Sequence, residues 1–223
     1  VVDLRGQLRQ LAGTVTECLD YLRPLALRRE PIDITLLAEE GLVLGLARAP
    51  QPARVDRNYQ SSLPMLEVDR QLLGVALVNL IVNACEAMAE ARGRESRLAI
   101  SIDVGPAPEL TRAVRVGRET GASASQCGGP PPLACSSLRV GRRSSASVPA
   151  RELRIAVGDT GLGIPEEIRD RIFDPFFTTR ASGSGIGLAN VQKIVHAHGG
   201  SLSLESSDLG SVFRVHLPMP ADA

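Results

Sequence analysis

The sequence has no net charge, no cysteine spacing typical of a metal site and no long apolar run. Its 25 basic and 25 acidic residues cancel, so no overall field favours a nucleic acid or an anionic membrane as a partner. The four cysteines, Cys18, Cys85, Cys127 and Cys135, lack the spacing of zinc ligands. Because neither a signal peptide nor an apolar run of membrane-spanning length is present, we expect this chain to be cytoplasmic and without membrane contact of its own. A membrane anchor elsewhere in a longer natural protein stays open.

Lysine and aromatic residues are also scarce. Lys193 is the only lysine, and aromatic residues make up 3% of the chain. We attribute the use of arginine in place of lysine to a compositional bias of the source. Hydrophobic residues still make up 43% of the 223 residues, which is enough for the core of one large domain, alone or with an appendage.

Apolar residues near the N terminus recur at a spacing of three to four residues. This spacing predicts a helix over residues 4–27 that ends before Pro31. The residues of the stripe are Leu4, Leu8, Leu11, Val15, Leu19 and Leu22. A stripe of this kind packs either on its own domain or along a dimer or coiled-coil seam, and the spacing alone leaves both open.

Beyond Pro31, local patterns predict alternating short elements. We expect strands at 32–34, 54–59, 63–66, 98–104, 152–157, 201–204 and 211–217, and helices at 36–47 and 70–91. Asp33 or Thr35 is suited to cap the first of these helices, and Asp69 the second. Residues 105–150 are rich in Gly, Pro and Ser, which predicts a long disordered insertion between two paired strands. This insertion is either a docking or regulatory arm, an ornamental loop or a misread frame.

The helix predicted over residues 70–91 carries polar side chains that share one face. Asn79, Asn83 and Glu86 follow one another at spacings of four and three residues, apart from the apolar stripe. Amides aligned among so many apolar residues indicate a bound ligand. The alternative is that they cap the helix or bond to backbone, as buried amides often do.

Two glycine-containing loops indicate a nucleotide site. The first follows a strand and reads Asp159-Thr160-Gly161-Leu162-Gly163, in which a carboxylate without a basic neighbour can accept a hydrogen bond from a base. The second, residues 183–188, opens a helix that continues to Val195. Free amides and the dipole at such a helix start favour phosphate.

Together with the aromatic segment 171–180, these loops come in a fixed order that resembles the G1, F and G2 boxes of the histidine-kinase ATP-binding domain. The helix at 70–91 resembles the N box of the same family, which shares its superfamily with gyrase, mismatch-repair and heat-shock-chaperone ATPases. The aromatic segment points to the kinase branch. The resemblance implies a Bergerat-type α/β fold, an α+β two-layer sandwich with a mixed, mostly antiparallel sheet against helices. It also implies that residues 1–30 are a partial dimerisation helix with its linker and that residues 31–223 are the ATP-binding domain.

The resemblance further implies a role for each motif residue. Asp159 would bind the exocyclic amine of adenine, Gly161 and Gly163 would allow close approach, and Ser211 would support Asp159. Asn79 and Asn83 would be the catalytic residues that hold Mg²⁺ and the phosphates. The remaining nucleotide contacts and lid residues would be Thr179, Arg180, Gly183, Gly185, Gly187 and Leu188, with Phe173, Phe176 and Phe177 as lid anchors. The role of Glu86 stays open.

The implied function is transfer of the γ-phosphate of Mg-ATP to a histidine on a dimerisation domain, followed by relay to the aspartate of a response-regulator receiver domain. The full-length protein would form a homodimer through its dimerisation helices. None of His196, His198 and His216 lies in a context that resembles the family's acceptor motif, so the acceptor is expected to lie outside this chain. The alternatives are a serine kinase of the anti-sigma type and a degenerate nucleotide-sensing interaction module without transfer activity.

Overall fold

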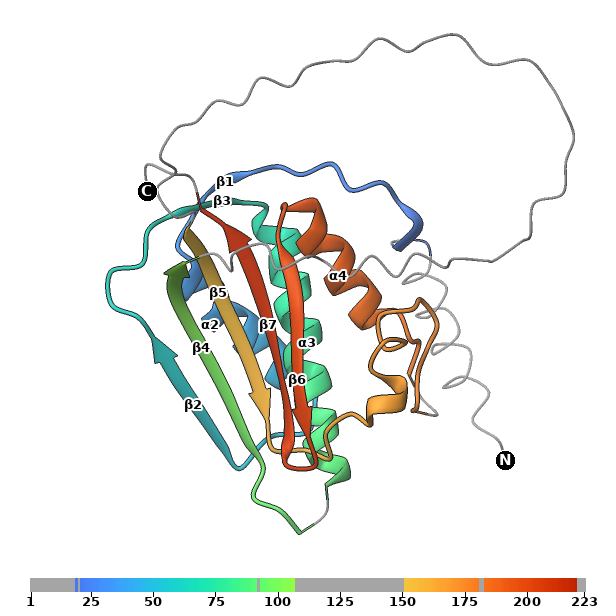
Figure 1. The fold of residues 1–223 in the computed structure, drawn as a ribbon. Coiled ribbons are helices and arrows are strands. Elements are labelled where there is room, and N and C mark those ends of the chain that lie inside the picture. The colour runs from blue at the N-terminus through green and yellow to red at the C-terminus, as the bar shows by residue number, and fades with distance from the viewer. Residues whose placement is uncertain (1–18, 20, 92, 107–150, 181–182, 220–223) are drawn as a thin grey trace, which may run out of the picture.

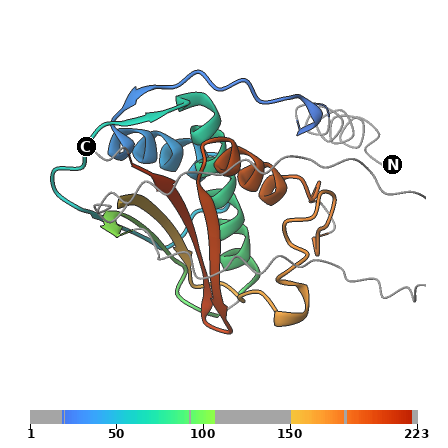
Figure 2. The same ribbon diagram turned by 45° about the horizontal axis from the view of Figure 1, so that its top comes forward.

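The computed structural model describes residues 19, 21–91, 93–106, 151–180 and 183–219. In chain order, its elements are β1 (Glu30–Ile32), α2 (Ile34–Leu46), β2 (Arg54–Tyr59), β3 (Leu66–Val68), α3 (Arg70–Glu90), β4 (Arg97–Pro106), β5 (Arg151–Asp159), the 3-10 turn η1 (Glu166–Ile168), α4 (Gly187–Ala197), β6 (Ser201–Ser207) and β7 (Gly210–Pro218). Figures 1 and 2 show α2, α3 and α4 side by side on one face of a twisted sheet. The described residues therefore form two layers.

The main sheet has the strand order β2-β4-β5-β7-β6. β2 and β4 are parallel, whereas every other neighbouring pair is antiparallel. β1 and β3 form a separate antiparallel pair. The predicted α+β two-layer sandwich with a mixed, mostly antiparallel sheet is confirmed.

Alternation of apolar and polar residues decides which face of the sheet meets the helices. On β4, Leu98, Ile100 and Ile102 are buried, while Ser101 and Asp103 between and after them are partly exposed. Apolar residues of β5 and β7 continue this buried face, and α3 packs on it with its own leucines. Asp69 begins α3 by accepting a hydrogen bond from the Leu72 amide at 3.0 Å. α3 is thus the central helix of the core.

By length and composition alone, α3 would be long and apolar enough to cross a membrane. Half of its most apolar window is buried inside the protein. Core helices of water-soluble domains have the same composition, so this match is weak evidence for a membrane span.

Two short strands and the N-terminal helix differ from the sequence prediction. The strand expected at 32–34 lies at Glu30–Ile32, because Asp33 caps α2 through the Thr35 amide at 2.8 Å and Ile34 already begins that helix. The strand expected at 63–66 lies at Leu66–Val68, where it pairs with β1. The helix expected up to residue 27 has ended by Arg23, which precedes Pro24 and is therefore disfavoured in helical geometry.

The strands expected at 98–104 and 152–157 pair as predicted and extend further. Their ladder runs from Leu98 opposite Asp159 to Pro106 opposite Arg151. The first two residues of the insertion predicted at 105–150 belong to β4 instead, and residues 107–150 lie outside the described residues. Pro106 and Arg151 pair at one end of the hairpin, and Asp159 lies at the other end.

Candidate nucleotide site

The start of α4 and the two asparagines of α3 lie next to each other. A methyl group added at Gly187 would be 3.9 Å from Asn79 Oδ1 and 4.0 Å from Asn83 Nδ2. No side chain of the described residues caps α4 at its N terminus. Its first amides therefore remain available to an anion, beside two amide side chains.

The side chains of Asn79 and Asn83 make no hydrogen bond to any other described residue. Both side chains are partly exposed, and Arg180 reaches Asn83 only at its backbone carbonyl, with Nη2 at 3.4 Å. The interpretation of these residues as capping or internally bonded amides is therefore not supported. Their carbonyl oxygens are hard ligands, and with phosphate oxygens they fit the oxygen coordination that Mg²⁺ requires.

Asp159, at the end of β5, is the carboxylate of the first glycine loop. Its Oδ1 accepts a hydrogen bond from the Gly161 amide at 2.8 Å, and no ion pair joins it to another described residue. Burial raises its pKa, and this effect is partly offset by hydrogen bonds from the backbone of Gly161 and Ser211 and by the charge of Arg180. Asp159 is thus a largely desolvated acceptor, as expected for recognition of a base.

The loop after Asp159 is held between α3 and the turn that joins β6 to β7. A methyl group at Gly161 would be 2.8 Å from the Ala87 carbonyl of α3, and one at Gly163 would be 1.9 Å from the Ser207 carbonyl. Gly163 also has a φ of +74°. Both positions require glycine because backbone packs directly against backbone there.

Ser211 is buried, and its hydroxyl lies 2.9 Å from the Ser206 hydroxyl. Ser206 in turn accepts a hydrogen bond from the Ile164 amide at 2.7 Å. The Ser211 backbone, not its hydroxyl, bonds the Asp159 carboxylate. Ser211 thus supports both ends of the loop.

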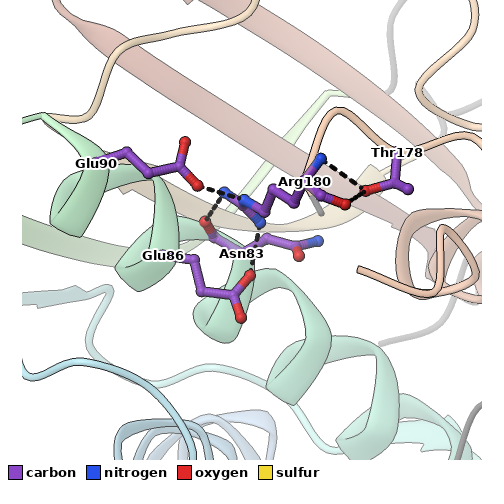
Figure 3. Close-up of polar contacts among 5 residues, drawn as sticks. All are labelled: Asn83, Glu86, Glu90, Thr178 and Arg180. Atoms are coloured by element: carbon purple, nitrogen blue, oxygen red, sulfur yellow. Dashed lines mark hydrogen bonds and ion pairs between the residues drawn. The ribbon is translucent and has the colours of Figure 1, made fainter. Parts of the chain in front are cut away.

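Arg180 points onto α3 instead of standing free. Its Nε donates to Glu90 Oε1 at 2.8 Å and its Nη1 to Glu86 Oε2 at 2.6 Å (Figure 3). Its backbone amide donates to Thr178 Oγ1 at 3.1 Å. Glu86, whose role the sequence leaves open, is therefore a partner of Arg180. Thr179 is exposed.

The second glycine loop is tied to the aromatic segment through backbone. The Phe176 amide donates to the Gly185 carbonyl at 2.9 Å, and a methyl group at Gly185 would be 2.5 Å from the carbonyl carbon of Phe176. Phe173 packs edge-to-face on Phe213 with ring centroids 6.5 Å apart, and Phe177 lies under Arg171. The ring of Phe176 is exposed, so only two of the three aromatic rings pack inward.

The structure also shows contacts that the sequence does not signal. Arg94 Nη1 donates to the Gly161 carbonyl at 3.2 Å and to the Asp208 carbonyl. Arg169 donates to the carbonyls of Ile164 at 3.0 Å and Ser206 at 2.8 Å. Except for the local contact of Arg169 with Ile164, these arginines bond backbone oxygens of distant segments, and such contacts have no signature in the residue types that accept them.

These features define a nucleotide-binding domain. Within the described part of the chain, the site combines a largely buried carboxylate in a glycine loop, two asparagine side chains without a hydrogen-bond partner and a helix start without a side-chain cap. Residues 130–221 match the family described as histidine kinase-, DNA gyrase B- and HSP90-like ATPase.

Among curated relatives, the sensory histidine kinase/phosphatase NtrB of Rhizobium leguminosarum bv. phaseoli is 30% identical over 196 residues, which cover 88% of this chain and 43% of the relative. The chain thus spans less than half the length of that relative. Among solved structures, full-length ShkA in complex with AMPPNP has a TM-score of 0.64 at 21% identity and covers 96% of this chain and 37% of its own. Histidine kinase ThkA in complex with the response regulator TrrA has a TM-score of 0.63 at 22% identity, and the match covers 98% of this chain and 50% of the ThkA chain. These two likenesses concern the fold.

The family match and the curated relatives together identify in this chain an ATP-binding catalytic domain of the sensor histidine kinase type. This confirms the resemblance seen in the sequence, and ATP is the ligand that the family match supports.

Proposed function

We propose that this chain transfers the γ-phosphate of Mg-ATP to a histidine on a dimerisation domain, from which it passes to the aspartate of a response-regulator receiver domain. The observation that carries the proposal is the meeting of the uncapped start of α4 with the unpartnered amides of Asn79 and Asn83. Phosphoryl transfer needs positioning and neutralisation of charge more than covalent chemistry. This arrangement supplies both.

Each motif residue has a proposed part in binding. Asp159 accepts a hydrogen bond from the adenine amine and so selects against guanine, which has a carbonyl there. The amides of Gly187 and Leu188 hold the phosphates, and Gly183 and Gly185 let the loop close over them. Asn79 and Asn83 would offer oxygen ligands to Mg²⁺, and the ion would supply positive charge to offset that of the phosphates. Arg180 contacts phosphate once it leaves Glu86 and Glu90, and Thr179 lies beside it.

The histidines of this chain lack the position of an acceptor. His196 lies in the last turn of α4 and His198 directly follows the helix, both at the end remote from Gly187. His198 is buried between the Asp69 amide and the Ile194 carbonyl. His216 lies on β7, in contact with Glu152 and Ser203. A transferred phosphoryl group needs an imidazole in line at near-attack distance, so the acceptor is supplied by a separate helix.

The proposed organisation follows from this function. Residues 1–30 are part of a dimerisation helix with its linker, and residues 31–223 are the catalytic domain. The full-length protein is a homodimer through its dimerisation helices, and this part works in the cytoplasm without contact to membrane or nucleic acid.

The test mixes this chain with γ-labelled Mg-ATP and a two-helix dimerisation domain that carries the acceptor histidine of its own kinase. We expect acid-labile, base-stable label on the added domain and none on the chain alone. Label that appears on a serine would support a serine kinase, and binding without any transfer would support a nucleotide-sensing module. Self-labelling of the chain at histidine would show that the acceptor lies within it.

The metal role of Asn83 has its own test. By calorimetry, Asn83→Ala should lose about tenfold or more of the ATP affinity in Mg²⁺ and clearly less in EDTA, because the lost ligand acts through the ion. His196→Gln, an exposed change at the far end of α4, is the control. Equal losses with and without Mg²⁺ would make Asn83 a structural amide.

A further inference from the structure

Helix α4 has one end at the proposed nucleotide site and the other beside the N-terminal segment. It runs from Gly187 to Ala197, which at 1.5 Å per residue is about 16 Å. In Figures 1 and 2 the segment that leads from the N-terminal helix to β1 passes along α4 before it crosses α3. One rigid helix therefore contacts both regions.

Lys193 joins α4 to the end of the N-terminal helix. Its Nζ donates to the carbonyl of Tyr21 and, at 2.7 Å, to the carbonyl of Arg23. It also lies 5.0 Å from the centre of the Tyr21 ring. A single ammonium group thus makes three contacts with a segment about 170 residues away.

The carbonyls of Tyr21 and Arg23 lie at the C-terminal end of a helix, where backbone carbonyls have no hydrogen-bond donor within the helix. The last backbone bond of this helix runs from the Arg23 amide to the Leu19 carbonyl at 3.2 Å, and Pro24 follows. A cation at a helix C terminus satisfies such carbonyls and interacts favourably with the helix dipole. Lys193 is therefore a C-terminal cap supplied by another element.

A second set of contacts holds the following residues to the same end of α4. The Arg28 amide donates to Asp69 Oδ2 at 2.8 Å, and the Asp69 amide donates to Nε2 of the buried His198 at 3.0 Å. Arg29 Nη2 donates to the Ala197 carbonyl at 3.4 Å. Residues 21–29 are thus anchored near both ends.

We propose that Lys193 is a positioning residue that couples the N-terminal segment to the nucleotide site through α4. The ammonium group fixes the end of the N-terminal helix on α4, and phosphate bound at Gly187 restrains the other end of the same helix. Nucleotide binding and ordering of residues 21–29 then favour each other. The cap itself stands on the contacts of Lys193, whereas the coupling also rests on the proposed function.

The cap is tested by hydrogen exchange of the full chain without nucleotide. Lys193→Met keeps the apolar stem but removes the donors, and we expect the amides of residues 21–29 to exchange about tenfold faster, through local opening. Lys193→Arg retains donors and charge and should stay within about twofold of the parent. His196→Gln, on an exposed site of the same helix, is the matched control and should also stay within about twofold. Circular dichroism confirms that each variant is folded.

An unchanged exchange rate in Lys193→Met, or an equal increase in His196→Gln, overturns the cap. With saturating Mg-ATP, exchange of residues 21–29 should slow in the parent and not in Lys193→Met, at equal nucleotide occupancy. If the parent binds Mg-ATP and this segment does not respond, the coupling is wrong. If the parent does not bind Mg-ATP at all, the proposed function fails together with the coupling, and the nucleotide-free comparison still decides the cap.

Discussion

At the scale of single residues, Asp159 is a largely buried carboxylate whose partners in the protein leave room for a ligand. Its carboxylate bonds only backbone amides and has no ion-pair partner among the described residues, so part of its hydrogen-bonding capacity is free for a ligand. We expect Asp159→Asn to weaken ATP binding by about 1–3 kcal/mol, because a charge-assisted hydrogen bond is lost, and to leave the fold intact. Calorimetry with Asp208→Asn, on the exposed β6–β7 turn, as control measures this. An affinity equal to that of the parent would remove Asp159 from adenine recognition.

The same burial makes stability depend on pH. Because the pKa of Asp159 is raised in the folded state, the folded protein retains this proton to higher pH than the unfolded chain does. The stabilising contribution is present below the unfolded pKa and is lost as pH rises through the folded pKa. Relative to Asp159→Asn, the free energy of unfolding of the parent should therefore fall as pH rises from the unfolded to the folded pKa of Asp159. Urea unfolding at a series of pH values measures it, and a constant difference between the two proteins would contradict the raised pKa.

Arg180 has two competing sets of partners. Glu86 and Glu90 hold it in the absence of ligand, and a phosphate would have to replace them. Because such partly exposed pairs contribute up to about 1 kcal/mol each, the double variant Glu86→Gln, Glu90→Gln should bind Mg-ATP about three- to tenfold more tightly. The gain should disappear in an Arg180→Gln background, and Glu205→Gln, which removes a more exposed carboxylate that pairs with Arg214 on the sheet, should show no gain. Calorimetry on these variants measures the affinities. A gain that persists in the Arg180→Gln background would show that Glu86 and Glu90 weaken nucleotide binding by some effect other than their pairing with Arg180.

At the scale of elements, the second glycine loop depends on a close backbone contact. Gly185 has a φ of +69°, and its Cα faces the Phe176 backbone. We expect Gly185→Val to weaken ATP binding by about tenfold or more in both Mg²⁺ and EDTA, because the loop can no longer pack and close. Gly93→Ala is the matched control, since Gly93 has a φ of +82° with nothing within 4 Å of an added methyl group. Calorimetry that shows equal effects at the two glycines would reduce the Gly185 effect to general backbone strain.

Local sequence patterns predict some features of these elements, whereas contacts between distant segments are not predictable from them. Local patterns mark Asp159, the two asparagines and the glycine loops, so the fold was predictable, and the structure brings Gly187 next to Asn79 and Asn83. The partners of Arg180 and the cap made by Lys193 depend on contacts between segments that are about 90 and 170 residues apart. No local pattern encodes such pairs. Lys193 in particular was attributed to composition, yet its ammonium group has specific partners.

The boundaries of the shortest strands were missed for a related reason. A strand of three residues carries almost no periodicity, so its limits are set by its neighbours. For β1 the decisive neighbour is Asp33, which begins α2 and excludes Ile34 from the strand. For β3 it is the pairing of Leu66 with Ile32. Propensity alone cannot place either limit.

At the scale of the whole molecule, the position of the nucleotide site relative to residues 107–150 allows a clear test. β4 and β5 pair without interruption up to Pro106 and Arg151, and Asp159 lies at the opposite end of this ladder. If residues 107–150 have no part in the site, replacing them with an Asn-Gly turn should leave Mg-ATP affinity within about twofold, since such a turn closes an antiparallel pair of this kind. The free energy of unfolding should rise by about 2–3 kcal/mol, because a shorter loop loses less chain entropy on closure. Calorimetry and urea unfolding measure the two effects, with the parent and Asp159→Asn as the reference proteins. A fold that is retained while Mg-ATP binding is lost would instead assign residues 107–150 to the nucleotide site.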